Sequence, residues 1–288
     1  MWFLPAIVSG IPIVKISQTL GPYRKWYVRF FSNIVFKHFD YIICRGQMSY
    51  EYTSLYMPKN NIYNLPDSAI CLQGIDDFQV DEILRGLTLV PNGYIALGPS
   101  FVMRDYFEND EYVEMLAEII AFLHRKCTLP ILLVPHSWKH SKKIGVDSVN
   151  DDYSVCCEVK KKVGDKIQCM IVDHEISARA FKSIIGHAYM AIGSRYHFLI
   201  ASLSSGVPSM ALGWSHKYKE LFDEFGLADF VIEHHEMTSQ RVVNIAGKLL
   251  EERESVYKMI NDKLPDVKNR SAENAALIIR CLSEKRII

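Results

Sequence analysis

The sequence lacks an excess of charge of either sign and any long, uninterrupted apolar run. Its 33 Lys and Arg residues balance 33 Asp and Glu residues, so the formal net charge is zero. A protein that neutralises nucleic-acid phosphates normally carries a basic excess, so we expect no nucleic-acid partner. Residues 1–16 are apolar, but Pro5, Gly10 and Pro12 interrupt them, and a membrane-spanning helix needs about 20 apolar residues. We therefore expect no transmembrane segment. We also expect no signal peptide, because a signal peptide begins with a basic region and the first basic residue here is Lys15.

Metal and nucleotide motifs are also missing. The seven cysteines contain no Cys-x-x-Cys pair, and none stands at a zinc-type spacing from a histidine. An odd number of unpatterned cysteines is typical of reduced thiols in a cytoplasmic protein. No Gly-x-Gly-x-x-Gly, Walker A, Gly-x-Ser-x-Gly or His-Glu-x-x-His motif occurs. We therefore expect no metal, no resident cofactor and a cytoplasmic location.

What is present is an ordinary globular composition, with 49% hydrophobic and 23% charged residues. Such a chain can bury a large core, and its length suggests two domains at about 150 residues each. Short β-branched runs alternate with helical stretches, which is typical of a parallel-sheet α/β architecture. Two polar helices, 238–262 and 271–284, are predicted to close the chain. The predicted strands are 13–17, 41–44, 94–98, 131–134, 168–172, 188–192, 207–212 and 230–232.

The domain boundary is predicted within residues 74–92, which are acidic and contain glycine and proline. This gives an N-terminal domain, 1–85, and a C-terminal domain, 86–288, whose last helix is expected to pack back on the first domain. An α/β domain usually opens with a strand and a glycine-rich turn, whereas this chain begins partway through one. We therefore expect earlier βα units of the N-terminal domain to be missing. Residues 137–150 are polar and basic and predict a mobile loop.

The segment Gly193-Ser194-Arg195-Tyr196-His197 is the most informative one for function. A buried strand ends at Gly193 and a helix begins near His197, so Arg195 is expected beside a helix N-terminus, where it favours a phosphate or carboxylate. His197 can exchange a proton near neutral pH. The structural alternative is a capping Ser194, an ion-paired Arg195 and a histidine buried in the core.

Four more polar residues lie near predicted strand ends, where open α/β sheets bind ligands. Arg45 and Lys217 would supply positive charge, His136 would point over the sheet edge, and Asp67 would orient an arginine or accept a proton. The alternatives are a surface ion pair for Arg45, a structural role for His136, a solvent-facing Lys217 and an Asx-type turn at Asp67. The pair Asp151-Asp152 predicts a helix cap.

These segments together resemble the polysaccharide pyruvyl transferases. The resemblance covers about residues 10–230. It rests on the runs 17–23 (SQTLGPY), 44–49 (CRGQMS) and 66–67 (PD), and then on 134–136 (VPH), 193–197 (GSRYH), 201–208 and 214–217 (WSHK) followed by 226–227. The block with arginine and histidine at 195 and 197, with its downstream Gly-x-Pro and lysine, is its most specific part.

The resemblance implies two Rossmann-like domains of the glycosyltransferase-B type. The implied activity moves pyruvate from phosphoenolpyruvate onto two hydroxyls of one sugar in a surface or exopolysaccharide, or in its lipid-linked precursor, as a ketal. The family's donor-contacting arginines match Arg45 and Arg195, and its catalytic histidine matches His197. His136, Lys217 and Asp67 are further substrate-binding candidates. Phosphoenolpyruvate then serves as a substrate, and the scheme needs no cofactor or metal.

Two other hypotheses remain open at this point. A nucleotide-sugar glycosyltransferase has the same type of fold, and fold does not determine function. An inactive, truncated homologue would explain the late start of the chain. A lipid-linked acceptor would favour peripheral attachment to the inner membrane, although no amphipathic anchor is evident in the sequence.

Overall fold

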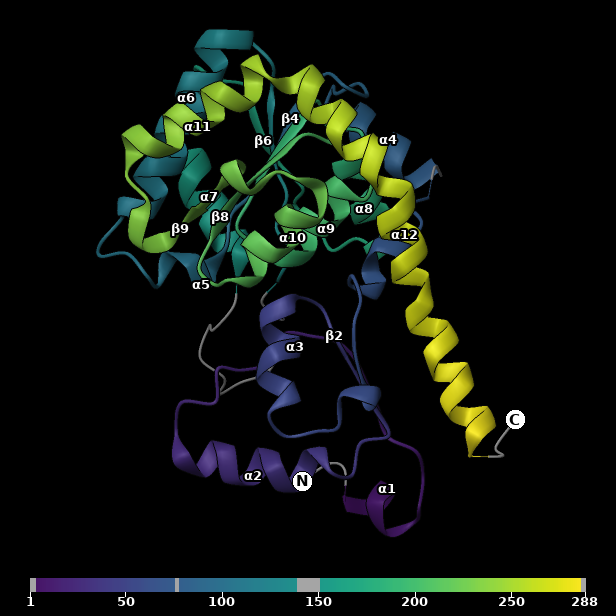
Figure 1. Cartoon of the computed structure of the whole chain (residues 1–288). Helices are drawn as coiled ribbons and strands as arrows, with labels where there is room; N and C mark the ends of the chain where they lie inside the picture. The colour runs from purple at the N-terminus through teal and green to yellow at the C-terminus, as the bar shows by residue number, and fades with distance from the viewer. Residues whose placement is uncertain (1–3, 76–77, 139–150, 286–288) are drawn as a thin grey trace. The chain divides into compact units, whose positions relative to one another are not determined.

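The computed structural model describes residues 4–75, 78–138 and 151–285 (Figure 1). The chain divides into two compact units. The smaller unit comprises Met1–Cys71 and Pro265–Ile288, and the larger unit comprises Leu72–Leu264. The sequence-based division near residue 85 stays a prediction, and most of the loop predicted over 137–150 lies outside the described residues.

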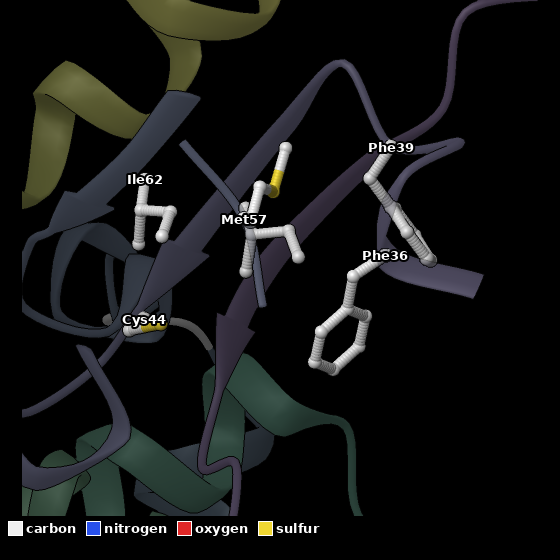
Figure 2. Close-up of a cluster of buried hydrophobic side chains, with 6 residues drawn as sticks. Phe36, Phe39, Cys44, Met57 and Ile62 are labelled. Atoms are coloured by element: carbon white, nitrogen blue, oxygen red, sulfur yellow. The ribbon is translucent and has the colours of Figure 1, made fainter. Parts of the chain in front are cut away.

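The smaller unit contains a three-stranded parallel sheet of order β1-β2-β3. Its strands are β1 (Val14–Gln18), β2 (Tyr41–Cys44) and β3 (Ile62–Asn64), joined by α2 (Trp26–Phe36), α3 (Gln47–Ser54) and a 3-10 turn, η1 (Lys59–Asn61). α1 (Leu4–Val8) precedes the sheet, and η2 (Ser68–Cys71) follows it. Every residue of the central strand β2 is buried. The core (Figure 2) consists of Phe36, Phe39, Ile42, Cys44, Met57 and Ile62.

The larger unit contains a six-stranded, all-parallel sheet of order β6-β5-β4-β7-β8-β9. The strands are β4 (Ile95–Gly98), β5 (Ile131–Leu133), β6 (Cys169–Ile171), β7 (Met190–Gly193), β8 (Ser209–Gly213) and β9 (Val231–Glu233). The four central strands are buried along their whole length, and all of their residues except Ser209 are apolar or glycine, because helices cover both faces of a parallel sheet. The predicted α/β class is confirmed.

Two groups of helices flank this sheet. α6 (Glu111–Cys127) packs with α7 (Asp152–Val163) and α11 (Ser239–Glu251), and α8 (Ala178–Gly186) packs with α4 (Phe78–Gly86) and α9 (Tyr196–Leu203). The other helical segments of this unit are α5 (Phe101–Arg104), α10 (Lys217–Phe225), the 3-10 turns η3 (Ala228–Phe230) and η4 (His234–Glu236), and the first part of α12 (Arg253–Glu284). No helix within the described ranges is both long and apolar enough to cross a bilayer.

The C-terminal helices differ from the sequence-based expectation. α11 ends at Glu251, and α12 then runs without a break from Arg253 to Glu284, with Pro265 inside it. The predicted break after residue 262 is therefore wrong. A proline removes one backbone hydrogen bond from a helix, but buried side chains on both sides of it, Leu264 and Val267, keep α12 packed.

The strand order reverses between β4 and β7, and this positions the candidate site. The chain passes from β4 to β5 and β6, and then returns to the other side of β4 as β7. Gly98 and Gly193 end these two strands, and the buried ring of Phe198 occupies the space that a Cβ at either position would need. Open α/β sheets bind ligands at such a reversal, outside the carboxyl ends of the strands.

Candidate functional site

Arg195 lies at this reversal, in the short turn between the end of β7 and the start of α9. It directly follows Ser194 and is the N-cap residue of α9. Its Nε donates to Asp152 Oδ2 at 2.8 Å, and its Nη2 donates to Asp152 Oδ1 at 2.6 Å. The exposed fraction is 16% for the Arg195 side chain and 0% for that of Asp152. The ion pair considered from the sequence is therefore present, in the bidentate geometry that holds a guanidinium in one orientation.

Asp152 also joins two other segments of the larger unit. Its Oδ1 accepts from the backbone N–H of Phe101 at 2.8 Å, and its Oδ2 accepts from that of Ser137 at 3.1 Å. The prediction that Asp151-Asp152 caps α7 is wrong for the side chains. Asp151 is the N-cap residue, but its carboxylate accepts no hydrogen bond from the first turn of the helix. The role of Asp152 could not be recognised from the sequence, because a polar residue that begins a helix normally faces water.

Two histidines stack beside this ion pair, from strands that flank β4. His136 follows β5, His197 lies in the first turn of α9, and their ring centroids are 5.9 Å apart at an interplanar angle of 10°. Water reaches both side chains. The His136 ring also contacts Phe181 edge to face, with ring centroids 5.4 Å apart. This partial desolvation, followed by the positive field of His197 and Arg195, lowers the pKa of His136 to about 4. His136 is therefore a neutral imidazole at neutral pH.

Lys217 begins α10, the helix that follows β8. Its Nζ lies 4.0 Å from the ring centroid of Trp214, 5.3 Å from that of Tyr218 and 5.7 Å from that of Tyr196. These distances are typical of cation–π contacts. Tyr196 directly precedes His197, and their ring centroids are 5.8 Å apart. The structure thus brings Lys217 to the same helix N-terminus as His197.

Buried hydroxyl groups hold the turn between β7 and α9. The Tyr112 hydroxyl shares a 2.7 Å hydrogen bond with Ser194 Oγ and accepts from the backbone N–H of Ser100 at 3.2 Å. Tyr218 donates to the Ser194 carbonyl at 2.8 Å. Burial raises the pKa of Tyr112, so its hydroxyl remains protonated. Sequence reasoning missed both tyrosines, because they are distant from Ser194 in the chain. Ser194 itself bonds to Tyr112, and the cap position belongs to Arg195.

A second arginine–aspartate pair stands in the smaller unit. Arg45 follows β2, its Nη1 donates to Asp67 Oδ2, and its Nε donates to Thr19 Oγ1 at 3.0 Å. Asp67 is buried, and its Oδ1 also accepts from the backbone N–H of Ala69 at 2.9 Å. Asp67 therefore both orients Arg45 and forms the Asx-type turn, so the two interpretations from the sequence are compatible. Arg45 and Arg195 have the same local arrangement, in which a buried carboxylate accepts hydrogen bonds from a guanidinium near a strand end.

The structure thus gathers Arg195, His136, His197 and Lys217 around one helix N-terminus in the larger unit, and it pairs Arg45 with Asp67 in the smaller unit. The group in the larger unit can orient an anionic substrate, because the N-terminus of α9 combines oriented N–H groups with cationic side chains. They can also move a proton at an exposed imidazole. Within the described ranges, no group of three or more His, Cys, Asp or Glu side chains is arranged to hold a metal ion.

Comparison with known proteins identifies the class. The sequence model of the polysaccharide pyruvyl transferase family matches residues 2–216, and the chain belongs to this family. The matched range includes all the strand-end residues described above except Lys217, which comes directly after residue 216, the last residue matched.

A curated relative and several solved structures are also similar. The amylovoran biosynthesis protein AmsJ of Erwinia amylovora is 20% identical over 267 residues, which cover 89% of this chain and 62% of that protein. The chain therefore spans less than two thirds of the length of this relative. A putative UDP-N-acetylglucosamine 2-epimerase from Listeria monocytogenes aligns with a TM-score of 0.67 at 14% identity, covering 98% of this chain and 71% of that one.

The S. aureus protein MnaA, solved with UDP, aligns with a TM-score of 0.64 at 14% identity, covering 90% of this chain and 66% of that one. The Neisseria meningitidis UDP-GlcNAc 2-epimerase, bound to UDP-GlcNAc, aligns with a TM-score of 0.61 at 13% identity, covering 96% of this chain and 72% of that one. At 13–14% sequence identity, these structural similarities show a shared fold and nothing about function. They are consistent with the predicted Rossmann-like, glycosyltransferase-B-like class.

Proposed function

We propose that this chain transfers pyruvate from phosphoenolpyruvate onto two hydroxyls of one sugar, forming a ketal. The sugar belongs to a surface or exopolysaccharide, or to its lipid-linked precursor. Family membership and the similarity to an amylovoran biosynthesis protein support this class of reaction. The observation that carries the donor assignment is the placement of Arg195, oriented by Asp152, beside the exposed His197 at the N-terminus of α9.

The reaction balances without a redox partner. The methylene carbon of phosphoenolpyruvate takes up a proton with the electron pair of the carbon–carbon double bond, which becomes a single bond, and the bond between carbon 2 and the phosphate oxygen breaks. Two new bonds join carbon 2 to the two sugar oxygens. Of the two hydroxyl protons, one replaces the proton given to the methylene carbon and the other leaves with inorganic phosphate. The catalyst must therefore supply a proton, accept protons and stabilise the departing phosphate.

The residues of the larger unit differ in which of these proton-transfer and anion-binding tasks they can perform. His136 is neutral at pH 7 because its pKa is about 4, so it cannot act as an imidazolium proton donor there. We assign the acid–base role to His197 and a hydrogen-bonding role toward the substrate to His136. Asp152 cancels the charge of Arg195, so Arg195 acts chiefly as an oriented N–H donor. Lys217 and the N-terminal dipole of α9 supply the remaining attraction for the donor's negative charge.

Arg45 and Asp67 belong to the smaller unit, and their part in donor binding stays a prediction. The pairing with Asp67 would hold Arg45 in one orientation, as Asp152 does for Arg195. An Arg45→Lys variant keeps the charge but loses the forked donor geometry, so we expect lower turnover from it.

Turnover with phosphoenolpyruvate tests the proposal. Purified protein is incubated with phosphoenolpyruvate and galactosyl, mannosyl or lipid-linked saccharides, and phosphate release is measured together with the mass of the product. His197→Ala should reduce turnover by about 100-fold or more, as removal of a general acid–base group usually does. His174→Ala is the matched control, because His174 is an exposed histidine after the edge strand β6. Equal loss in both variants, or none in His197→Ala, would contradict the assignment.

Ligand-induced stabilisation separates the alternatives. A ligand that binds only the folded state raises the melting temperature, with about 2.7 kcal/mol of stabilisation at 100 times its dissociation constant. We expect phosphoenolpyruvate to produce such a shift. A shift with UDP or a UDP-sugar and none with phosphoenolpyruvate would favour a nucleotide-sugar glycosyltransferase, since the structural neighbours include proteins solved with UDP and UDP-GlcNAc. No shift with either would favour an inactive homologue.

A further inference from the structure

Helix α2 presents an apolar face to solvent. The sequence predicts an amphipathic helix over residues 24–38 whose apolar positions include Trp26, Phe30, Val35 and Phe36. The structure divides this set. Phe36 is buried in the core of the smaller unit (Figure 2), and Val35 packs against that core. Trp26 and Phe30 point away from the core, with exposed fractions of 77% and 56%.

The exposed side chains form one continuous surface, which we call the α2 face. It consists of Trp26, Tyr27, Phe30, Phe31 and Ile34, all of them exposed. Trp26, Phe30 and Ile34 are spaced by four residues and form one row along the helix, and Tyr27 and Phe31 form the adjacent row. Neighbouring rings contact each other edge to face, with centroids 6.1 Å apart for Trp26 and Tyr27 and 5.5 Å apart for Phe30 and Phe31. A contiguous patch of this kind marks an interaction surface.

The segment that contains the α2 face carries charge of one sign. Residues 21–39 contain Arg24, Lys25, Arg29 and Lys37 and no acidic residue, although the whole chain is neutral. All four basic side chains are exposed. Arg29 donates to the carbonyls of Tyr23 and Arg24 at 2.8 and 3.3 Å, which ties the segment before the helix to its first turn. The apolar rows therefore have a basic rim.

We propose that the α2 face binds the surface of a bilayer that contains anionic lipids. Tryptophan and tyrosine rings favour the depth of the lipid headgroups, where an apolar ring and a polar edge are both accommodated. Phenylalanine and isoleucine reach the acyl boundary, and the basic rim is attracted to lipid phosphates. A second copy of this chain fits less well, because packing α2 against α2 would bring two basic rims together.

This inference does not depend on the proposed activity. It changes the sequence-based view that no amphipathic anchor is present, because the helical pattern did not show which apolar residues face outward. If the acceptor is lipid-linked, the same surface would bring the chain to the membrane that contains it.

Vesicle co-sedimentation tests the inference with the full chain. The wild-type protein should bind vesicles of phosphatidylcholine mixed with phosphatidylglycerol more tightly than vesicles of phosphatidylcholine alone, and high salt should reduce the difference. Arg24→Gln/Lys25→Gln should weaken binding to the anionic vesicles by about 25-fold, at about fivefold for each charge near the surface. Trp26→Ser/Phe30→Ser should weaken binding to both vesicle types by about tenfold or more.

Leu55→Ser is the matched control. Leu55 is an apolar residue of the same unit, 73% exposed and outside α2. We expect this variant to bind vesicles as the wild type does, and circular dichroism checks that every variant remains folded. No binding by the wild type, or equal binding by Trp26→Ser/Phe30→Ser, overturns the proposal. Self-association without vesicle binding, abolished by the same two substitutions, would assign the α2 face to a second copy and also overturn it.

Discussion

The buried carboxylate of Asp152 offers the sharpest test of how the site is held. It accepts four N–H donors, two from the Arg195 side chain and one each from the backbones of Phe101 and Ser137. Asp152→Asn keeps the size of the side chain but removes the charge. One of the two oxygens becomes an NH2 group, which then faces two donors instead of accepting from them. The Arg195 guanidinium loses its counter-ion at the same time.

The expected loss of stability is large. Removing one partner of a buried ion pair costs about 3–5 kcal/mol, because the other charge remains in a region that water hardly reaches. The geometry here supports the full range, since Asp152 is fully buried and only 16% of Arg195 is exposed. Folded proteins have free energies of unfolding of about 5–15 kcal/mol, so this substitution removes a large fraction of the total. We expect the urea midpoint to fall while the slope of the transition is unchanged.

A comparison with Asp151→Asn controls for the general effect of the chemical change. Asp151 is the preceding residue, and its side chain makes no cap bond to α7. Asp151→Asn should lower the free energy of unfolding by less than about 1 kcal/mol, as is usual for a half-exposed position. Equal losses in the two variants, or a loss below about 1 kcal/mol in Asp152→Asn, would refute the argument that the ion pair organises the site.

A double-mutant cycle separates the ion pair from the other contacts of Asp152. Asp152→Asn combined with Arg195→Met removes both charges and should be less destabilised than the sum of the two single variants. We expect a coupling of about 1–3 kcal/mol, since contacting residues in one network are not additive. Additive losses would show that Asp152 acts through the Phe101 and Ser137 amides alone.

Two further predictions concern the same edge of the sheet. Because the pKa of His136 is lowered to about 4, the unfolded chain binds a proton between about pH 6.5 and pH 4 that the folded chain does not. The free energy of unfolding should therefore decrease as the pH falls through this window, and His136→Gln should lessen that decrease. The opposite slope would contradict the shift. Gly98→Ala would place a Cβ 2.5 Å from the buried ring of Phe198, and it should cost about 1–3 kcal/mol in urea unfolding. Gly86→Ala, with nothing within 4 Å of its Cβ, should be nearly neutral, and a similar loss at both positions would contradict the steric reasoning.

The fold class was predictable from local patterns. Buried parallel strands appear in the sequence as short β-branched runs, and the alternation with helices indicates a parallel sheet. The central strands β4, β7 and β8 match the predicted runs closely, because all of their residues are buried and all but Ser209 are apolar or glycine. The break predicted after residue 262 failed, because packing around Pro265 outweighs the local cost of a proline in a helix.

The candidate residues at strand ends were also predictable, because their position follows from the topology of a parallel sheet. Arg45, His136, Arg195, His197 and Lys217 all follow strands, as the sequence indicates. Asp67, which was expected to orient an arginine, pairs with Arg45, whereas the partners of Arg195 and of the turn that precedes it were not predictable. Asp152 reaches Arg195 across 43 residues of chain, and Tyr112 reaches Ser194 across 82.

The amino-acid sequence alone thus determined the alternation of strands and helices and the residue types at the carboxyl ends of the strands. Both depend on interactions within a few residues, which a linear pattern records. Only the tertiary structure decided that a buried carboxylate orients Arg195, that two histidines stack, and that the aromatic rows of α2 face outward. Those outcomes depend on which side of each element packs against the core, and this is set by contacts between residues far apart in the chain.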